Sequence, residues 1–392
     1  MANNLPLNRQ FAHIQQSPTV AVSDRMLALK AAGRAVISLT AGDPDFSTPD
    51  GVVAAGINAM RSGLTHYGPS RGFPHLRAAI ADKLAAPYNP ESEILVTHGG
   101  VHAYYTALQS ILNPGDAVLI PDPSWGTHAN MVRLLRGTVV SVPALPEEAF
   151  LPKLQAWQAA LTPETRALVI NYPANPTGAI PPRDYLKALL EFAAQHNLWV
   201  ISDEVYENLY FNEKPLSVGA FPEHRNHVIL VNSLSKTYAM TGWRVGYLAA
   251  PNAIIENALK ASQNSITCVA PFIQEAAAFA LTDPAVQTQA DAMRAGYAHR
   301  RALVMRIFEE YENSPVLVTP PQGAFYFFLD MRVLSMCADE ICEQLLEQAG
   351  VGLVPGTAFG PGGEGFVRMT IAASDEDVAT GFRAILEWAS RQ

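Results

Sequence analysis

Long apolar segments are absent from this sequence. A membrane-spanning helix needs roughly 18 to 20 consecutive apolar residues, and no window of the chain contains such a run. The N-terminal segment MANNLPLNRQF also lacks the apolar core of a secretory signal peptide. We therefore expect a cytoplasmic protein that has no membrane among its partners.

Cysteines and basic side chains are also scarce. The chain has three cysteines, Cys268, Cys337 and Cys342, whose spacing fits no metal site and whose odd number prevents complete pairing. This usage is typical of a reducing compartment, so we expect free, buried thiols and no metal ion. The net charge of −9 argues against nucleic acid as a partner, because nucleic acids bind basic surfaces.

Apolar residues are plentiful and regularly arranged. Hydrophobic residues make up 49% of the 392 positions, which is enough for more than one core. Continuous Val/Ile/Leu runs alternate with amphipathic segments, as expected when helices cover both faces of a parallel sheet. The predicted strands are 93–97, 116–120, 166–170, 198–202, 227–232 and 243–249, and the predicted helices are 101–112, 125–136, 152–161 and 182–196. This alternation predicts a large α/β domain with a doubly wound, mostly parallel sheet.

The pattern changes after residue 284. A long helical stretch over 284–312 leads to predicted strands at 315–318, 324–330, 351–354 and 366–371 and predicted helices at 337–349 and 375–390. We expect a smaller α+β domain here. The predicted organisation is an N-terminal arm that shares in the small domain (1–47), a large domain (48–288) and a small C-terminal domain (289–392).

Polar side chains follow the predicted strands where the chain leaves the sheet. In open α/β sheets, ligands bind beyond the carboxyl ends of parallel strands, so these side chains should meet at one edge. The segments concerned are His98–Val101, Asn171–Gly178, Asp203–Tyr206 and Ser233–Lys236, with Arg244 eight residues beyond the lysine.

These side chains have the chemistry that a pyridoxal cofactor requires. A helix that starts with two glycines offers free amides to a phosphate, and Ser233 and Arg244 add hydrogen-bond donors. The carboxylate of Asp203 can keep a pyridine nitrogen protonated, and Lys236 can form an imine with an aldehyde and then act as a base. Taken singly, Asp203 could cap a helix and Arg244 could pair on the surface. Their joint occurrence at strand ends favours a cofactor site.

Four motifs resemble the class I aminotransferases of fold type I, and within them the prokaryotic aspartate aminotransferase subgroup. The motifs are Asn175–Gly178 (NPTG), Asp203–Tyr206 (DEVY), Ser233–Lys236 (SLSK) and Met240–Tyr247 (MTGWRVGY). The resemblance covers nearly the whole chain. It implies the fold of the pyridoxal-phosphate-dependent transferases of type I. The implied activity is a transaminase of the EC 2.6.1 type, which moves an amino group from an L-amino acid to a 2-oxo acid such as 2-oxoglutarate or pyruvate. The implied chemistry is ping-pong, through a Schiff base on Lys236.

The resemblance also implies roles for single residues around pyridoxal 5'-phosphate. Lys236 would carry the cofactor and transfer the proton, Asp203 would pair with the ring nitrogen, and Tyr206 would bind the 3'-oxygen together with Asn175. These three, Lys236, Asp203 and Tyr206, are the implied catalytic residues. The remaining cofactor contacts are implied for Gly100, Val101, Ser233 and Arg244 at the phosphate and for Trp125 against the ring.

Further implied roles concern the substrate and a second subunit. Arg368 matches an arginine that clamps the substrate carboxylate with its planar fork, and Gly42 and Asn175 match residues of the same subsite. Tyr67 matches a tyrosine that reaches the phosphate of the neighbouring subunit. The resemblance therefore implies a homodimer with shared active sites.

The sequence departs from the aspartate-using relatives at one position. Those relatives place a lysine after the glycines of the phosphate helix, whereas this chain has Val101 followed by His102. The departure favours a non-acidic amino donor. Three alternatives stay open: an aspartate aminotransferase proper, a pyridoxal-phosphate-dependent lyase of the same fold, and a non-catalytic sensor of the cofactor or of amino acids.

Overall fold

A seven-stranded sheet forms the centre of the larger part of the molecule. The computed structural model describes residues 8–14, 18–311 and 314–392. In the sheet the strands follow the order β2-β8-β7-β6-β5-β3-β4. Their bounds are β2 Ile94–Thr97, β3 Ala117–Asp122, β4 Thr138–Pro143, β5 Thr165–Asn171, β6 Trp199–Asp203, β7 Val228–Ser233 and β8 Gly246–Ala249. β8 runs antiparallel to both of its neighbours, and the other neighbouring pairs are parallel.

Helices cover both faces of this sheet, so the predicted α/β fold is confirmed. Side chains alternate between the faces of a strand: Val169 and Ile201 belong to one core, whereas their neighbours Leu168 and Val200 belong to another. The helices that contribute to the first core are α4 Gly99–Ile111, α5 Gly126–Leu134 and α8 Asn252–Ser265, and those of the second are α6 Leu154–Ala159 and α7 Arg183–Gln195. A third core lies among α2 Asp50–Arg61, α3 Pro74–Lys83 and α9 Pro271–Thr282.

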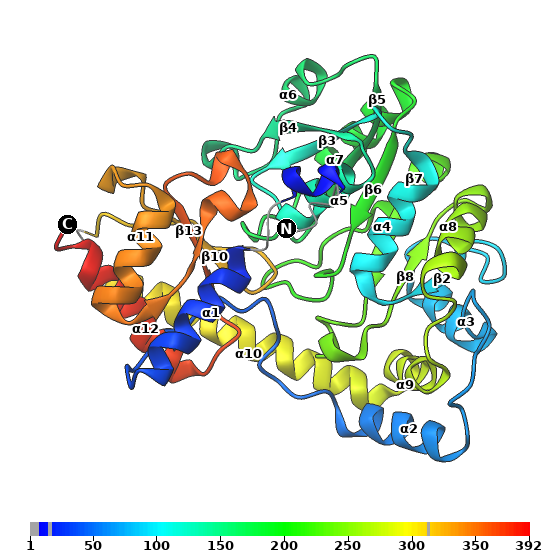
Figure 1. Ribbon diagram of the computed structural model, residues 1–392, viewed down its shortest axis with the longest axis horizontal. Helices are drawn as coiled ribbons and strands as arrows, with labels where there is room; N and C mark the ends of the chain where they lie inside the picture. Colours follow the sequence, from blue (N-terminus) through cyan, green and yellow to red (C-terminus); the bar gives the residue numbers. More distant parts are fainter. Residues whose placement is uncertain (1–7, 15–17, 312–313) are drawn as a thin grey trace, which may run out of the picture.

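A second, smaller sheet lies beside the first (Figure 1). It is antiparallel, with the order β12-β13-β10-β9. The bounds are β9 Leu317–Val318, β10 Tyr326–Asp330, β12 Val354–Pro355 and β13 Phe366–Thr370, with the helices α11 Ala338–Gln344 and α12 Asp375–Ala389 beside them. From the N-terminal part, α1 Pro18–Ala31 packs here, and β1 Ile37–Ser38 pairs with β11 Val351–Gly352.

One long helix, α10 Pro284–Glu309, connects the two parts. Its first half places Val286 and Met293 in the core of the larger part, and its second half places Tyr297 and Val304 in the core of the smaller part. The predicted boundary at 288/289 therefore falls inside a continuous helix. The division into 1–47, 48–288 and 289–392 stays a prediction, and residues 1–7 and 15–17 of the arm lie outside the described ranges.

Several elements differ from those predicted. The helices α2, α3, α8 and α9 and the strand β4 were not predicted. β4 lies at the edge of the sheet, and most of its residues are exposed or half-buried, so it lacks a run of buried apolar residues. Strand β8 starts at Gly246 instead of residue 243, because a 3-10 turn over Thr241–Trp243 and a left-handed Arg244 (φ 54°) precede it. The predicted helix 337–349 is α11 followed by a π-helical turn over Leu345–Ala349.

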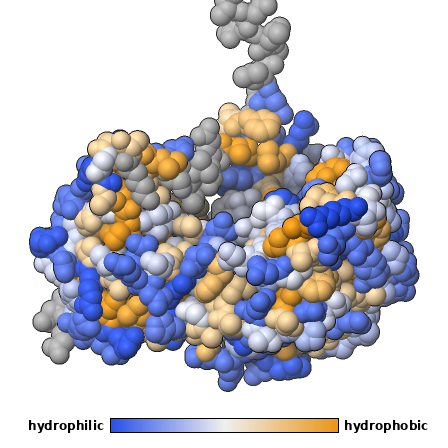
Figure 2. Space-filling model, turned by 90° about the horizontal axis from the view of Figure 1, so that it is seen from below, coloured by the Kyte–Doolittle hydropathy of each residue, from blue (hydrophilic) through white to orange (hydrophobic). Residues whose placement is uncertain are grey.

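The surface and the cysteines complete the description. On the lower face of the molecule, shown in Figure 2, hydrophobic residues lie in separate groups among hydrophilic ones. Within the described ranges, no helix is both long and apolar enough to cross a membrane. All three cysteines are free, as predicted, but only Cys342 is buried and Cys337 is exposed.

Candidate active site

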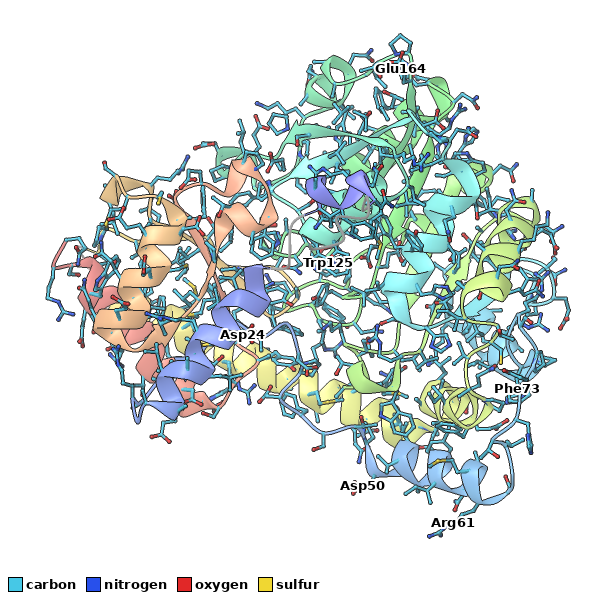
Figure 3. The ribbon with its side chains drawn as sticks, viewed as in Figure 1. Asp24, Asp50, Arg61, Phe73, Trp125 and Glu164 are labelled. Carbon is cyan, nitrogen blue, oxygen red and sulfur yellow. The ribbon has the colours of Figure 1, made fainter. Side chains whose placement is uncertain are left out.

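A cavity of about 430 Å³ lies where the parallel strands end and the smaller part of the molecule begins. Every residue predicted for the site lines it except Tyr67. The predicted lining residues are Gly42, Gly100, Val101, Trp125, Asn175, Asp203, Tyr206, Ser233, Lys236, Arg244 and Arg368, and they are joined by Asp43, Thr127, Asn171, Val205, Ser235, Thr241 and Tyr326. Trp125 marks the place in Figure 3, between the large sheet and the smaller part.

Lys236 enters the cavity three residues after the end of β7. Its ammonium group donates to the carbonyl oxygen of Gly42. Burial lowers the pKa of Lys236 to about 8; the negative charge of Asp43 raises it, and the positive charges of Arg368 and Arg244 lower it further. A lysine with this pKa has a substantial neutral fraction near pH 8, and the neutral amine is the nucleophilic form.

Asp203 is the last residue of β6 and is 5% exposed. Its Oδ2 lies 3.1 Å from Nε2 of His128, and its Oδ1 accepts a hydrogen bond from the backbone N–H of Val205 at 3.2 Å. The side chain of Asn171 donates to the backbone oxygen of Asp203 at 3.0 Å. Because an ionised carboxylate can only accept, Nε2 of His128 carries the hydrogen. The aspartate is therefore held rigidly, with its charge next to the cavity.

The start of α4 forms an anion cradle. Gly99 has φ +78°, and a Cβ at this position would lie 2.8 Å from Nη2 of Arg244, so a glycine is required for the guanidinium to approach. Gly100, Val101, Ser233 and Arg244 line the cavity here. The N-cap residue His98 makes no side-chain capping hydrogen bond. The amides of the first turn therefore face a site that suits an anion such as a phosphate.

Arg368, on β13, lies at the opposite side of the site and is 3% exposed. Its Nη1 donates to Oδ1 of Asn175 at 3.0 Å, and its Nη2 donates to the backbone oxygen of Thr40 at 2.7 Å. The guanidinium lies between the rings of Tyr326 and Phe359, with Cζ 4.3 and 4.9 Å from the ring centroids. Its Nε is buried and has no hydrogen-bond partner among the described residues. This planar, partly unsatisfied fork suits a carboxylate.

Beside the anion cradle, α4 presents an apolar side chain to the cavity. Val101 is 39% exposed and apolar. The next residue, His102, is buried and accepts a hydrogen bond from the backbone N–H of His98 through Nδ1 at 3.3 Å. Burial lowers the pKa of His102 to about 4, and the neighbouring His98 lowers it further. His102 is therefore neutral at pH 7 and supplies no positive charge to this end of the site.

Tyr67 lies apart from the other predicted residues. Its side chain is 87% exposed, and it does not line the cavity of its own chain. The exposure leaves the phenol available to another molecule. Its predicted role at a neighbouring subunit stays a prediction.

Three side chains in or next to the cavity were not predicted from the sequence. His128 was missed although it lies three residues after Trp125 on a helix that follows a strand end, which is a usable signal. Asp43 follows the predicted residue Gly42 directly, and this position in the sequence is a usable signal as well. Tyr326 is part of the aromatic run Phe325–Phe328, which looks like core in the sequence, so it carries no signal of its own.

The donor set fits pyridoxal 5'-phosphate. An amine that is neutral near pH 8, a fixed carboxylate and a cradle for an anion line one cavity, and a carboxylate fork stands opposite them. Within the described ranges, no group of three or more His, Cys, Asp or Glu side chains could hold a metal ion. Fold and site together define a pyridoxal-phosphate-dependent enzyme.

Known proteins give the family. Residues 34–385 match the family model described as aminotransferase class I and II. The chain is 39% identical over 378 residues to an aspartate/prephenate aminotransferase of Thermus thermophilus, covering 95% of this chain and 96% of that protein. It is 38% identical over 346 residues to aromatic-amino-acid aminotransferase 2 of Thermococcus litoralis, covering 87% and 88%. The solved structure of the Thermus thermophilus aspartate aminotransferase with maleate superimposes with a TM-score of 0.92 at 36% identity, covering 98% and 99%. The chain belongs to the class I and II aminotransferase family and is an aminotransferase of the EC 2.6.1 type that uses pyridoxal 5'-phosphate.

Proposed function

We propose that this aminotransferase takes its amino group from an L-amino acid with an uncharged side chain, including aromatic ones, and passes it to a 2-oxo acid by ping-pong chemistry. One observation carries the proposal. Of the described residues that line the cavity, the cations are Lys236, Arg244 and Arg368, and each has a place at the reacting amine, the anion cradle or the carboxylate fork. A second substrate carboxylate at Val101 would meet an apolar side chain instead and would keep its desolvation cost.

The residues of the chain divide the work of the reaction. Arg368 and Asn175 hold the α-carboxylate that donor and acceptor share, while the rings of Tyr326 and Phe359 keep the guanidinium in place. Lys236 would hold the cofactor and would move the proton at the α carbon of the substrate. When bound, pyridoxal 5'-phosphate supplies the aldehyde that accepts the amino group and a ring that takes up the electron pair of the α carbon.

Further proposed roles concern the ring of the cofactor and its phosphate. We propose that Asp203, held by His128, pairs with the ring nitrogen and keeps it protonated. Tyr206 and Asn175 bind the 3'-oxygen, and Trp125 stacks on the ring. The amides of Gly100 and Val101, with Ser233 and Arg244, hold the phosphate; this last set is supported by the cradle at the start of α4.

A second candidate is an aspartate aminotransferase proper. It is favoured by the names of several relatives, among them aspartate aminotransferases of Pyrococcus abyssi and Geobacillus stearothermophilus. It would require a further cation near Val101, beyond those that the described part of one chain places in the cavity, such as one from a second subunit. We propose a homodimer as the working unit, supported by the exposed Tyr67. The cytoplasmic location stays a prediction from the composition.

A donor and acceptor screen of the purified holoenzyme tests the proposal. The visible band of the cofactor is followed after addition of phenylalanine, leucine, alanine, aspartate or glutamate, and then of 2-oxoglutarate or pyruvate. We expect the band to disappear with the uncharged donors and to return with a 2-oxo acid, and kcat/KM for phenylalanine or leucine to exceed that for aspartate. A preference for aspartate would support the second candidate. Release of ammonia without return of the band would show a lyase.

A further inference from the structure

We propose that Tyr326 is a positioning residue whose phenol hydroxyl donates a hydrogen bond to Tyr206, so that the hydrogen of Tyr206 is left for the 3'-oxygen of the cofactor. This inference rests on the proposed role of Tyr206. Tyr326 is the first residue of β10, is 1% exposed and lines the cavity. It comes from the smaller part of the molecule, whereas Tyr206 follows β6 of the large sheet.

The contact between the two phenols is short and buried. Their hydroxyl oxygens lie 2.8 Å apart, and their rings meet edge to face with centroids 5.9 Å apart. Burial raises the pKa of both Tyr206 and Tyr326, so both are protonated at neutral pH. Each phenol has a single hydrogen, so one of the two donates and the other accepts.

The direction of the bond follows from what each hydroxyl must do. In the part of the chain that the structure describes, Tyr206 is the hydrogen-bond partner of the Tyr326 hydroxyl. If Tyr206 donated to Tyr326, it would have no hydrogen left for a cofactor oxygen in the cavity. If Tyr326 donates to Tyr206, all three oxygens are satisfied in one chain. A phenol that accepts a hydrogen bond is also a stronger donor, because successive hydrogen bonds polarise one another.

The ring of Tyr326 has a separate contact. It lies against the guanidinium of Arg368, with Cζ 4.3 Å from the ring centroid. The backbone of Gly42 passes close to the hydroxyl, since a Cβ there would lie 2.9 Å from the phenol oxygen. The hydroxyl therefore serves Tyr206 and the ring serves Arg368. Two substitutions can separate these effects: Tyr326→Phe removes the hydroxyl alone, and Tyr326→Met removes both.

The test is a pH titration of the visible band of the holoenzyme, which reports the protonation of the nitrogen that links Lys236 to the cofactor. A weaker donor leaves more negative charge on the 3'-oxygen and makes the neighbouring nitrogen more basic. For Tyr326→Phe we expect the midpoint to rise by about 0.1 to 0.6 pH unit, and by less than in Tyr206→Phe, because Tyr206 still donates to the 3'-oxygen and loses only the polarisation, about 10–30% of the strength of that bond. Binding of 3-phenylpropionate should change less than about twofold in Tyr326→Phe and weaken about fivefold or more in Tyr326→Met, which loses the cation–π contact.

Controls separate this inference from its alternatives. Tyr297→Phe removes a buried phenol hydroxyl from the same core, where the ring packs on Phe46 and Phe325, and should titrate like the wild type. The double variant Tyr206→Phe/Tyr326→Phe should shift no further than Tyr206→Phe alone, because the two hydroxyls act in series. Should Tyr326→Phe lose its native circular dichroism, Tyr326→Met provides the same midpoint.

Two outcomes of the titration would each overturn a different assignment. A midpoint of Tyr326→Phe equal to that of the wild type, or additive shifts in the double variant, would overturn the role of Tyr326. A wild-type protein without a pH-dependent visible band would instead overturn the assignment of Lys236 and Tyr206 to the cofactor.

Discussion

The imidazole of His128 lies directly behind the carboxylate of Asp203, with 3.1 Å between Nε2 and Oδ2. The histidine is fully buried and packs against Tyr104 and Trp125, with ring centroids 4.7 and 5.1 Å away. Its Nδ1 is buried, and no residue in the described part of the chain forms a hydrogen bond with it. Asp203, at the end of strand β6, is thus oriented by a side chain of helix α5.

His128→Phe should lower kcat/KM about ten- to a hundredfold, because it removes a hydrogen bond to a charged group while it keeps an aromatic ring in the core. Asp203→Ala should lower it further, since it removes the carboxylate itself, and Asp203→Glu should be milder than Asp203→Ala. Steady-state kinetics with one donor and one acceptor give the comparison. Near-native turnover of Asp203→Ala would show that the residue has a structural role only.

Lys236→Ala should abolish steady-state transamination while the cofactor still binds non-covalently. Loss of the general base alone typically costs about 10² to 10⁴ in rate, and the covalent link is lost as well. Borohydride reduction of the wild type followed by peptide mapping should find the label on Lys236. A label on Lys260, which lies on the surface helix α8, or on any other lysine would contradict the assignment.

Loading of the apoenzyme with cofactor should depend on pH through the amine of Lys236. The protonated amine does not attack the aldehyde, so the rate should fall about tenfold per unit below pH 8 and level off above it. Asp43→Asn should move the midpoint to lower pH, because the charge of Asp43 raises the pKa of Lys236. Asp43→Glu keeps the charge and serves as the control. Stopped-flow absorbance at several pH values gives the profiles, and an unshifted midpoint in Asp43→Asn would refute the coupling.

Arg368→Lys should weaken donors and acceptors alike, because both present the same carboxylate. A lysine keeps the charge but has no planar fork, and it cannot maintain the contacts with Asn175 and Thr40 together with the substrate. The loss of a charged hydrogen bond corresponds to about ten- to a hundredfold in kcat/KM. The two half-reactions, measured separately, should be affected to a similar extent. Kinetics equal to those of the wild type would place the carboxylate elsewhere.

Val101→Lys should shift the relative kcat/KM toward aspartate or glutamate by about tenfold or more, because a hydrogen-bonded cation there would offset the desolvation of a second carboxylate. Val101→Met, of similar length without the charge, is the matched control. The ratio of kcat/KM for glutamate to that for phenylalanine is the measured quantity. An unchanged ratio in Val101→Lys would show that the substrate side chain does not reach this position.

The strand-end rule accounts for how much of the site could be predicted from the sequence. Asp203, Ser233 and Lys236 follow continuous apolar runs, and these runs are the buried parallel strands β6 and β7. Local patterns of this kind decide where a side chain leaves a sheet. Such patterns predict most of the cavity lining from the sequence alone.

Contacts between distant segments could not be predicted in the same way. Tyr206 meets Tyr326 across 120 positions, and Arg368 meets Thr40 across 328. Neither pair leaves a periodic signal, because each depends on how the smaller sheet packs against the larger one. The helices α2, α3, α8 and α9 were also missed, and each of them begins at a proline or directly after one.

The placement of Val101 and Thr127 has a consequence for how such an enzyme diversifies. Both lie in the first turns of helices, α4 and α5, whereas the lysine and the aspartate follow strands of the sheet interior. A substitution in a helix turn can reshape the substrate pocket without disturbing the ladder of strands that fixes the reacting groups. Mutations at such positions can therefore change the substrate preference of the enzyme while the residues that transfer the proton stay the same.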